Sequence, residues 1–205
     1  MSEALTIPEF QVVKIPFPSP QFEISGVWLD EYSGGNSRTS LKFLQWLRSG
    51  VKHAQPGQLE AYQKAYDSDL GKHQSRLQAA LKPVTWDLLV EAPSSKPHAA
   101  QFAEVARVVR ETPEIILKKT TATSATGGSS VDQLTNSLIL DSELDLSVFR
   151  NVLIVDDVLA VGNTVTAIIH KLQLSGLNTG AKISLAVALR VIPSPPRIKI
   201  DLAKI

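Results

Sequence analysis

The stretch "NVLIVDDVLAVGNTVTAIIHKL", residues 151–172, decides how the rest of the chain is interpreted. A run of apolar residues is followed by two adjacent carboxylates, Asp156 and Asp157, then by a loop of small residues and an apolar helical pattern. This order predicts a buried strand, a loop and a helix. Two like charges at the end of a buried strand repel each other, so we expect a positive or hydroxyl-rich group beside them.

The loop after the two carboxylates has the composition of an anion-binding turn. It leads the chain into the start of a helix, where unpaired backbone N–H groups and the helix dipole favour an anion such as phosphate. Gly162 allows a close backbone approach or a positive φ, and Thr164 can cap the helix or donate a hydroxyl. Asp156 and Asp157 can accept hydrogen bonds from ribose hydroxyls and stabilise positive charge on the sugar ring. A sugar phosphate therefore satisfies both halves of the pattern.

Composition limits the classes of protein to which the chain can belong. Its 205 residues, 43% hydrophobic and 20% charged, are enough for one sizeable core with a small accessory lobe. A net charge of +1 provides no broad attraction for nucleic acid or an anionic membrane, so neither is an expected partner. The chain has no cysteine, which excludes disulfides and thiol nucleophiles. With neither a signal-like start nor a membrane-spanning apolar run, we expect a cytoplasmic location.

Strand and helix patterns alternate from residue 84 onward. This alternation predicts an α/β fold with a mainly parallel sheet flanked by helices. The expected strands cover 84–92, 114–119, 151–157 and 181–191, and the expected helices cover 98–111 and 164–176. Ligands of such folds bind outside the carboxyl ends of the strands. Asp156, Asp157 and the chain break at 94–96 all lie at such ends.

The amino-terminal part of the chain has a different pattern. We predict a small hood-like lobe and a helical connector over residues 1–82, followed by the α/β core over 83–205. Strands are expected within 22–37, and a helical pattern occupies 41–47. The helix-favouring connector, 56–83, is interrupted only by Gly71.

Residues 121–133 contain almost no apolar side chains, so they cannot easily pack against a core. We interpret this segment as a mobile surface loop, with a passive linker as the alternative.

The segment "VLIVDDVLAVGNT", residues 152–164, resembles the 5-phosphoribosyl-1-pyrophosphate (PRPP) binding motif of the type I phosphoribosyltransferases. That motif has four apolar residues, two acidic residues and a loop of the form T-G-G-T or T-G-x-T. A weaker resemblance extends over residues 84–191 and implies the family's fold. Adjacent acids also occur in receiver domains and Walker-B strands, but no GxxxxGK[ST] precedes them here, and a receiver's paired acids lie at its first strand. The segments "YSGGNSRTSLKFL" and "PSSKPHAAQFAEVAR" faintly resemble the ComF-like branch, whose cysteine zinc motif this chain lacks.

The resemblance assigns a role to each matching position. Asp156 and Asp157 are the expected catalytic carboxylates, facing the ribose hydroxyls. The expected contacts of the 5-phosphate are Ala160, Val161, Gly162, Asn163 and Thr164, and those of the pyrophosphate are Ser94, Ser95 and Lys96. Lys118 and Lys119, at the edge of the loop, are further candidate contacts. The family binds Mg²⁺ largely through PRPP, so no residue is expected to hold a metal directly.

The implied reaction transfers the phosphoribosyl group to a nitrogen acceptor, with a nucleobase as the leading candidate, and releases pyrophosphate. Two departures from the family pattern leave a second interpretation open. Val161 stands where the family has Thr or Ser, and residues 121–133 contain no arginine. We favour an active phosphoribosyltransferase; the alternative is a weak or inactive PRPP- or nucleotide-binding module with a regulatory or ComF-like role. The acceptor base is not identified by the sequence, and a homodimer is left open.

Overall fold

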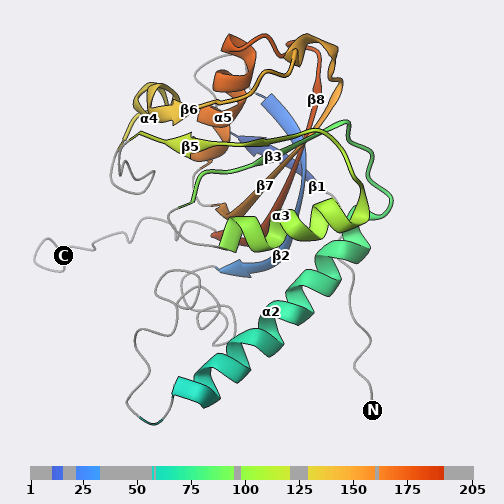
Figure 1. The fold of residues 1–205 in the computed structure, drawn as a ribbon, viewed down its shortest axis with the longest axis vertical. Helices are drawn as coiled ribbons and strands as arrows, with labels where there is room; N and C mark the ends of the chain where they lie inside the picture. Colours follow the sequence, from blue (N-terminus) through green and yellow to red (C-terminus); the bar gives the residue numbers. More distant parts are fainter. Residues whose placement is uncertain are drawn as a thin grey trace, which may run out of the picture.

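The computed structural model describes residues 11–15, 22–32, 57, 59–94, 98–120, 129–159 and 162–191. Within these ranges a six-stranded sheet has the order β1-β2-β8-β7-β3-β4, and a separate two-stranded sheet joins β5 to β6. All neighbours in the large sheet are parallel except β1 and β2. Helices lie on both faces of this sheet (Figure 1). The predicted α/β class with a mainly parallel sheet is therefore confirmed.

The strands of the large sheet are β1 (Gln11–Ile15), β2 (Phe22–Tyr32), β3 (Leu88–Glu91), β4 (Glu114–Ile116), β7 (Asn151–Leu159) and β8 (Lys182–Val191). The longer helices are α2 (Leu59–Leu81), α3 (His98–Val109) and α5 (Asn163–Leu174). The shorter elements are β5 (Lys118–Lys119), α4 (Val131–Ser137), β6 (Leu138–Ile139) and the 3₁₀ turn η3 (Leu146–Val148). No helix in the described ranges has the length and apolar character needed to cross a bilayer.

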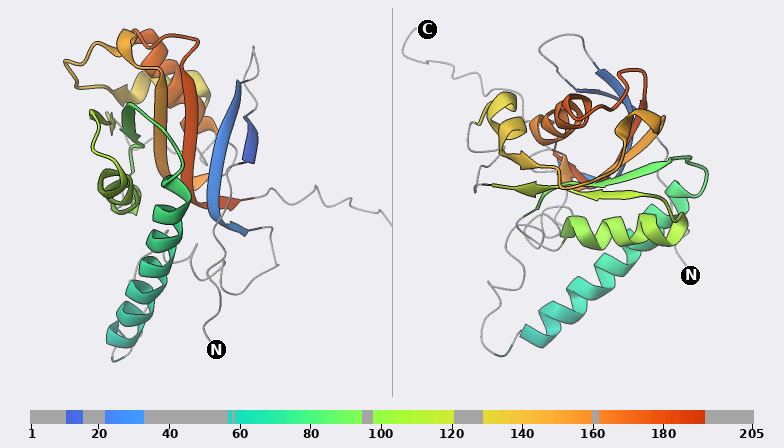
Figure 2. Two further views of the ribbon diagram at one scale, coloured as in Figure 1. Left: turned by 90° about the vertical axis from the view of Figure 1, so that its right-hand side faces the viewer. Right: turned by 45° about the horizontal axis from the view of Figure 1, so that its top comes forward.

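The central strand β7 is apolar on both faces because both faces are covered. Alternate side chains of a strand point to opposite sides of the sheet. Val152 and Ile154 pack in the cluster that includes α5, whereas Leu153 and Val155 pack in the cluster that includes α2 and α3. The two layers of helices are visible on either side of the sheet in Figure 2. A strand at the centre of a parallel sheet is therefore expected to be an unbroken run of apolar residues.

The carboxyl-terminal half of α3 is tied to β3 and β4 through one arginine. The guanidinium of Arg107 contacts Glu91 at 2.8 Å, Glu104 at 2.9 Å and Glu114 at 2.9 Å. These hydrogen bonds, first of all that to Glu114, raise the pKa of Arg107 above its usual range. Because Glu91 ends β3 and Glu114 begins β4, the cluster joins α3 to both strands that it connects.

The chain reverses its direction of travel across the sheet between β3 and β7. The unit β3-α3-β4 proceeds towards one edge, and the unit β7-α5-β8 proceeds towards the other. Neighbouring strands β3 and β7 therefore form the topological switch point of the sheet, at whose carboxyl ends a crevice is the common binding site of such folds.

Three local expectations are corrected. The strand β2, assigned to the amino-terminal lobe, pairs in parallel with β8 and so belongs to the main sheet. Gly71 does not interrupt the connector, because it lies inside α2, a continuous helix of 23 residues. The end of the segment 121–133 is helical, since the Ser130 side chain caps α4 through a reciprocal bond pair with Gln133. The rest of the predicted division, into a lobe with its connector up to residue 82 and a core after it, stays a prediction. The helix expected at 41–47 lies outside the described residues.

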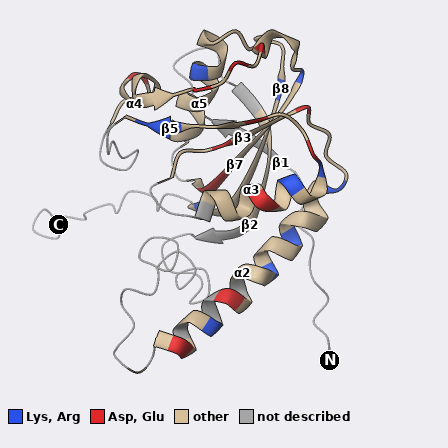
Figure 3. Cartoon of the chain, in the orientation of Figure 1, with Lys and Arg blue, Asp and Glu red and all other residues tan. Residues whose placement is uncertain are grey.

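The charges on α2 change along its length. Figure 3 shows residues of both signs on this helix, with the acidic ones in its first half and only basic ones in its second half. One side of its second half is buried and contains Leu70, Leu77 and Leu81. The helix is therefore held by apolar packing at its carboxyl end, while its first half extends beyond the sheet (Figure 1).

The packing of α3 generates a stability prediction. Phe102 is completely buried (0% exposed) and Val108 on the same helix is 66% exposed. We expect Phe102→Ala to lower the free energy of unfolding by about 3 to 5 kcal/mol, because it empties a packed site. Val108→Ala, the matched control, is expected to change it by less than about 0.5 kcal/mol. Urea unfolding followed by circular dichroism measures both values, and equal losses would contradict the assigned buried face of α3.

Candidate functional site

Three strand ends meet at the carboxyl edge of the sheet. The backbone N–H of Ala92, directly after β3, donates to the carbonyl of Val155 on β7 at 2.9 Å. On the other side of β3, the N–H of Leu117 donates to the carbonyl of Glu91 at 3.2 Å. These bonds place Ala92 beside Val155 within β7, and Leu117, which follows β4, beside the end of β3, at the switch point of the fold.

Asp156 lies at this edge with its side chain almost enclosed, since the residue is only 6% exposed. One carboxyl oxygen accepts a hydrogen bond from the backbone N–H of Asp157 at 2.8 Å. Burial raises the pKa of Asp156 well above its ordinary value, and the charge of Asp157 raises it further. The Asp157 N–H and the positive charge of Lys119 act in the opposite direction. Asp156 therefore holds a proton to higher pH than a solvated aspartate does.

Asp157 and Asp156 offer different access to a ligand. Asp157 is only partly buried, whereas Asp156 is among the buried polar residues of the core. Together the two carboxyls provide hydrogen-bond acceptors for hydroxyl groups and negative potential for a developing positive charge.

The start of α5 faces the same edge because it follows β7 after a short connection. Gly162 is the N-cap residue and has φ 83°, in the left-handed region where glycine is favoured. Its carbonyl accepts from the N–H of Thr166 at 2.9 Å, the first bond of the helix. A glycine cap has no side chain with which to bind the first-turn N–H groups, so they remain suited to an anion. Asn163 and Thr164, in this first turn, are partly exposed.

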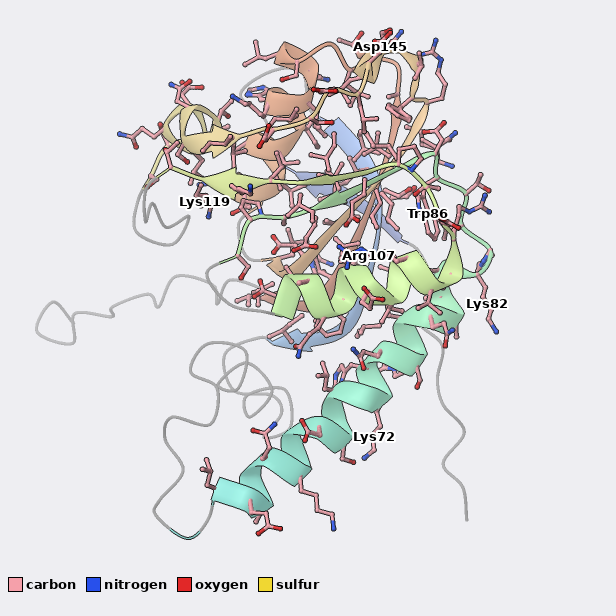
Figure 4. All side chains as sticks on the ribbon, in the orientation of Figure 1. Lys72, Lys82, Trp86, Arg107, Lys119 and Asp145 are labelled. Carbon is pink, nitrogen blue, oxygen red and sulfur yellow. The ribbon has the colours of Figure 1, made fainter. Side chains whose placement is uncertain are left out.

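The two candidate lysines take different positions. Lys119 is partly buried on β5, where it pairs with Leu138 of β6 (Figure 4). Its positive charge opposes the rise in the pKa of Asp156. Lys118 is exposed. Neighbouring residues of a strand point to opposite faces, which accounts for the difference. The sequence alone did not distinguish these two residues.

Of the expected site residues, the structure describes Asp156 and Asp157 on β7, Gly162, Asn163 and Thr164 at the start of α5, and Lys118 and Lys119 on β5. Ser94 is described and exposed just after β3, but Ser95, Lys96, Ala160 and Val161 lie outside the described residues. Their contacts with pyrophosphate or phosphate stay predictions. The loop expected after the acids is shorter than anticipated, because β7 continues through Leu159.

No protein-family model and no curated protein matches the chain. Similar solved structures include a purine phosphoribosyltransferase from Pyrococcus horikoshii, with 14% identity and a TM-score of 0.41, covering 60% of this chain and 86% of that one. A hypoxanthine phosphoribosyltransferase from Staphylococcus aureus has 17% identity and a TM-score of 0.42, covering 62% and 74%. A phosphoribosyltransferase from Corynebacterium diphtheriae has 15% identity and a TM-score of 0.36, covering 73% and 85%. At these identities and TM-scores, the function of the site is inferred from the chain's own residues and not from the similar structures.

The backbone at the start of α5 can be tested by comparing two glycines. Gly162→Ala is expected to lower the free energy of unfolding by about 1 to 2 kcal/mol, because an L side chain is strained at its positive φ. Gly71 lies inside α2 with open space where a Cβ would be added. Gly71→Ala should therefore raise stability by about 0.5 to 1 kcal/mol. Denaturant unfolding measures both changes, and a stabilising Gly162→Ala would contradict the left-handed cap.

The buried carboxyl of Asp156 predicts a pH-dependent stability. The folded state binds its proton more tightly than the unfolded chain, whose aspartates have a pKa of about 3.9. Stability contributed by this group is therefore present below that value and is lost as the pH rises through the folded-state pKa. We expect Asp156→Asn to gain stability relative to the parent as pH increases from about 4.

Unfolding in urea at a series of pH values provides the measurement. Asp141→Asn, which removes an exposed carboxyl before β7, is the control. A difference between Asp156→Asn and the parent that stays constant with pH, or that changes equally for Asp141→Asn, would count against the buried site.

Proposed function

We propose that this chain is a phosphoribosyltransferase-type protein that binds PRPP, or the corresponding nucleoside monophosphate, at the carboxyl edge of β3 and β7. It transfers the phosphoribosyl group to a nitrogen acceptor, with a nucleobase as the leading candidate, and releases pyrophosphate. The observation that carries the proposal is the position of Asp156 and Asp157 in the last four residues of β7, beside the switch point of the sheet, with the glycine-capped start of α5 following β7 in the chain. A sugar that carries a phosphate matches this combination.

In this proposal each part of the edge recognises one part of the ligand. The 5-phosphate binds to backbone N–H groups of residues 160–164, where the start of α5 favours negative charge. The ribose hydroxyls donate hydrogen bonds to Asp156 and Asp157. The pyrophosphate binds Ser94, Ser95 and Lys96 after β3, with Lys119 at the side. The ribose then spans the distance between the 5-phosphate site and the two aspartates.

The reaction breaks the bond between the anomeric carbon and the pyrophosphate oxygen, and the electron pair leaves with pyrophosphate. The acceptor nitrogen forms the new bond to the anomeric carbon and gives up a proton. Positive charge develops on the sugar ring during this exchange, and the two aspartates are placed to stabilise it. Their contribution is largest when both carboxyls are held in position beforehand, as the hydrogen bond from Asp157 N–H holds Asp156.

Mg²⁺ is part of the proposal as a companion of PRPP. Magnesium typically takes many of its ligands from substrate phosphates, so in this proposal PRPP itself holds the ion and no residue is assigned to bind it directly. In the described part of the chain, no group of three His, Cys, Asp or Glu side chains is arranged to hold a metal ion. When bound, the ion would neutralise charge on the pyrophosphate.

The second candidate is a module that binds PRPP or a nucleotide without efficient turnover, in a regulatory or ComF-like role. Val161 favours it, because a missing hydroxyl to the 5-phosphate costs about 1.5 to 3 kcal/mol for a bond to a charged group. The absence of arginine from residues 121–133 favours it too, since pyrophosphate then has fewer cationic contacts. The cytoplasmic location and a homodimer stay predictions under both candidates.

Calorimetric titration and thermal shift with PRPP, pyrophosphate and a set of nucleoside monophosphates, with and without Mg²⁺, test the proposal. Saturable PRPP binding supports it, and a preferred monophosphate identifies the base. An assay of pyrophosphate release with that base then separates the two candidates. Absence of binding by PRPP and by every monophosphate would remove both.

The double variant Asp156→Asn/Asp157→Asn should bind PRPP at least about 10-fold more weakly, because each lost hydrogen bond to a charged group contributes about 1.5 to 3 kcal/mol. Its folding should be retained, since removing two repelling carboxyls relieves the free protein. The double variant Asp141→Asn/Glu143→Gln removes two other carboxyls before β7 and serves as the control for net charge. Equal PRPP affinities for the two double variants would overturn the assignment of the acidic pair.

A further inference from the structure

Trp28 of β2 lies in the same row of the sheet as Asp156, and on the same face. Asp156 pairs with Val187 of β8, and Val187 pairs in turn with Trp28. The three residues therefore form one row across the neighbouring strands β7, β8 and β2 (Figure 2). Directly paired residues of a sheet share a face, and with strands about 4.8 Å apart the backbone of Trp28 lies about 10 Å from that of Asp156.

The guanidinium of Arg190 covers the Trp28 ring, at 4.4 Å from the ring centroid. Arg190 lies near the carboxyl end of β8 and pairs with Leu159, the last residue of β7. Trp28 packs against the core cluster that includes α5, so the ring and the guanidinium lie on the α5 side of the sheet. Stacking on the ring holds the planar guanidinium in one orientation, with its N–H donors directed along its own plane.

The order of the strands places the acceptor of the proposed reaction on this side of the acidic pair. In the proposed function pyrophosphate binds after β3, and β3 and β8 lie on opposite sides of β7. In a single displacement the nucleophile approaches the face of the sugar that is opposite to the leaving group. The acceptor nitrogen therefore approaches the ribose from the side of β8, whose carboxyl end contains Arg190. This step rests on the proposed function.

We propose that Arg190, held by Trp28, is a specificity-determining residue that recognises an acceptor heterocycle by an oxo group on its ring. A guanidinium has only N–H donors, so it matches a ring oxygen and leaves an amino group at the same position without a partner. Its five donors allow an arginine that already has contacts within the protein to bind a ligand oxygen as well. The acceptor class is therefore oxo-substituted rather than amino-substituted nitrogen heterocycles.

Two pairs of nucleoside monophosphates differ mainly by an oxo or an amino group at one ring position: inosine against adenosine, and uridine against cytidine. By calorimetric titration, the parent protein should bind the oxo member of at least one pair about 10-fold more tightly, because that member makes a hydrogen bond to a charged group. Arg190→Met should weaken binding of the oxo member about 10-fold and of the amino member less than about 2-fold. Arg190→Lys, which keeps the charge without the planar fork, should retain part of the preference.

The matched control is another arginine that stacks on a tryptophan. Arg110 lies over the Trp86 ring, 5.4 Å from its centroid, and precedes β4, at the opposite edge of the sheet. Arg110→Met should leave the preference for oxo ligands unchanged, and thermal unfolding establishes that both Met variants are folded. A parent without the preference, or equal losses of it in the two Met variants, overturns the inference while PRPP binding stands. If neither PRPP nor any monophosphate binds the parent, the proposed function fails and this inference fails with it.

A second measurement tests whether the base lies beside the stacked pair. The indole N–H resonance of Trp28 in an NMR spectrum is assigned by its loss in Trp28→Phe. It should shift when the preferred oxo monophosphate binds, and shift much less with ribose 5-phosphate, which has the same sugar phosphate without a base. Equal shifts with the two ligands would place the base away from Trp28 and overturn the inference.

Discussion

Asp156 is enclosed within β7, a strand covered on both faces, one residue beyond the point where its pairing with β3 ends, and this constraint organises the site. A carboxyl in such a place loses hydration, and the adjacent Asp157 adds repulsion. The fold offsets part of this cost locally, through the N–H of Asp157 at 2.8 Å. The positive charge of Lys119 on β5 also acts to lower the pKa of Asp156, although less than burial and Asp157 raise it. The remaining cost is the kind that a ligand with several hydroxyl donors can relieve.

The elements around this strand were predictable where a single periodicity determined them. The apolar residues of β7 and β8 are buried on both faces, and Phe102 and Ala106 mark the inner side of α3, as their spacing indicated. The adjacent acids and the glycine at the start of α5 were visible in the sequence because their spacing along the chain is short. Each of these patterns depends only on residues that are close together in the sequence, so the strand, loop and helix could be placed without knowledge of the rest of the chain.

Other features depend on contacts between distant parts of the chain. The pairing of β2 with β8 joins residues more than a hundred positions apart, and a strand pattern by itself does not indicate which sheet the strand will join. The helix at 131–137 is short and mostly polar; the reciprocal cap between Ser130 and Gln133 starts it, and its buried Leu134 anchors it in the core. The choice between Lys118 and Lys119 required the β5–β6 ladder, because two adjacent lysines are equivalent in sequence.

The end of β3 is supported from the side of β4 and α3. Because β4 runs parallel to β3, the N–H of Leu117 continues their ladder by binding the carbonyl of Glu91, and the chain then passes into β5. Arg107 strengthens the same corner by joining α3 to the end of β3 and the start of β4. Glu91 is therefore held twice at the end of β3, through its carbonyl by Leu117 and through its carboxylate by Arg107. Because Glu91 also pairs with Val155 of β7, the residue before Asp156, backbone and side-chain bonds together fix the strand that borders the acidic pair.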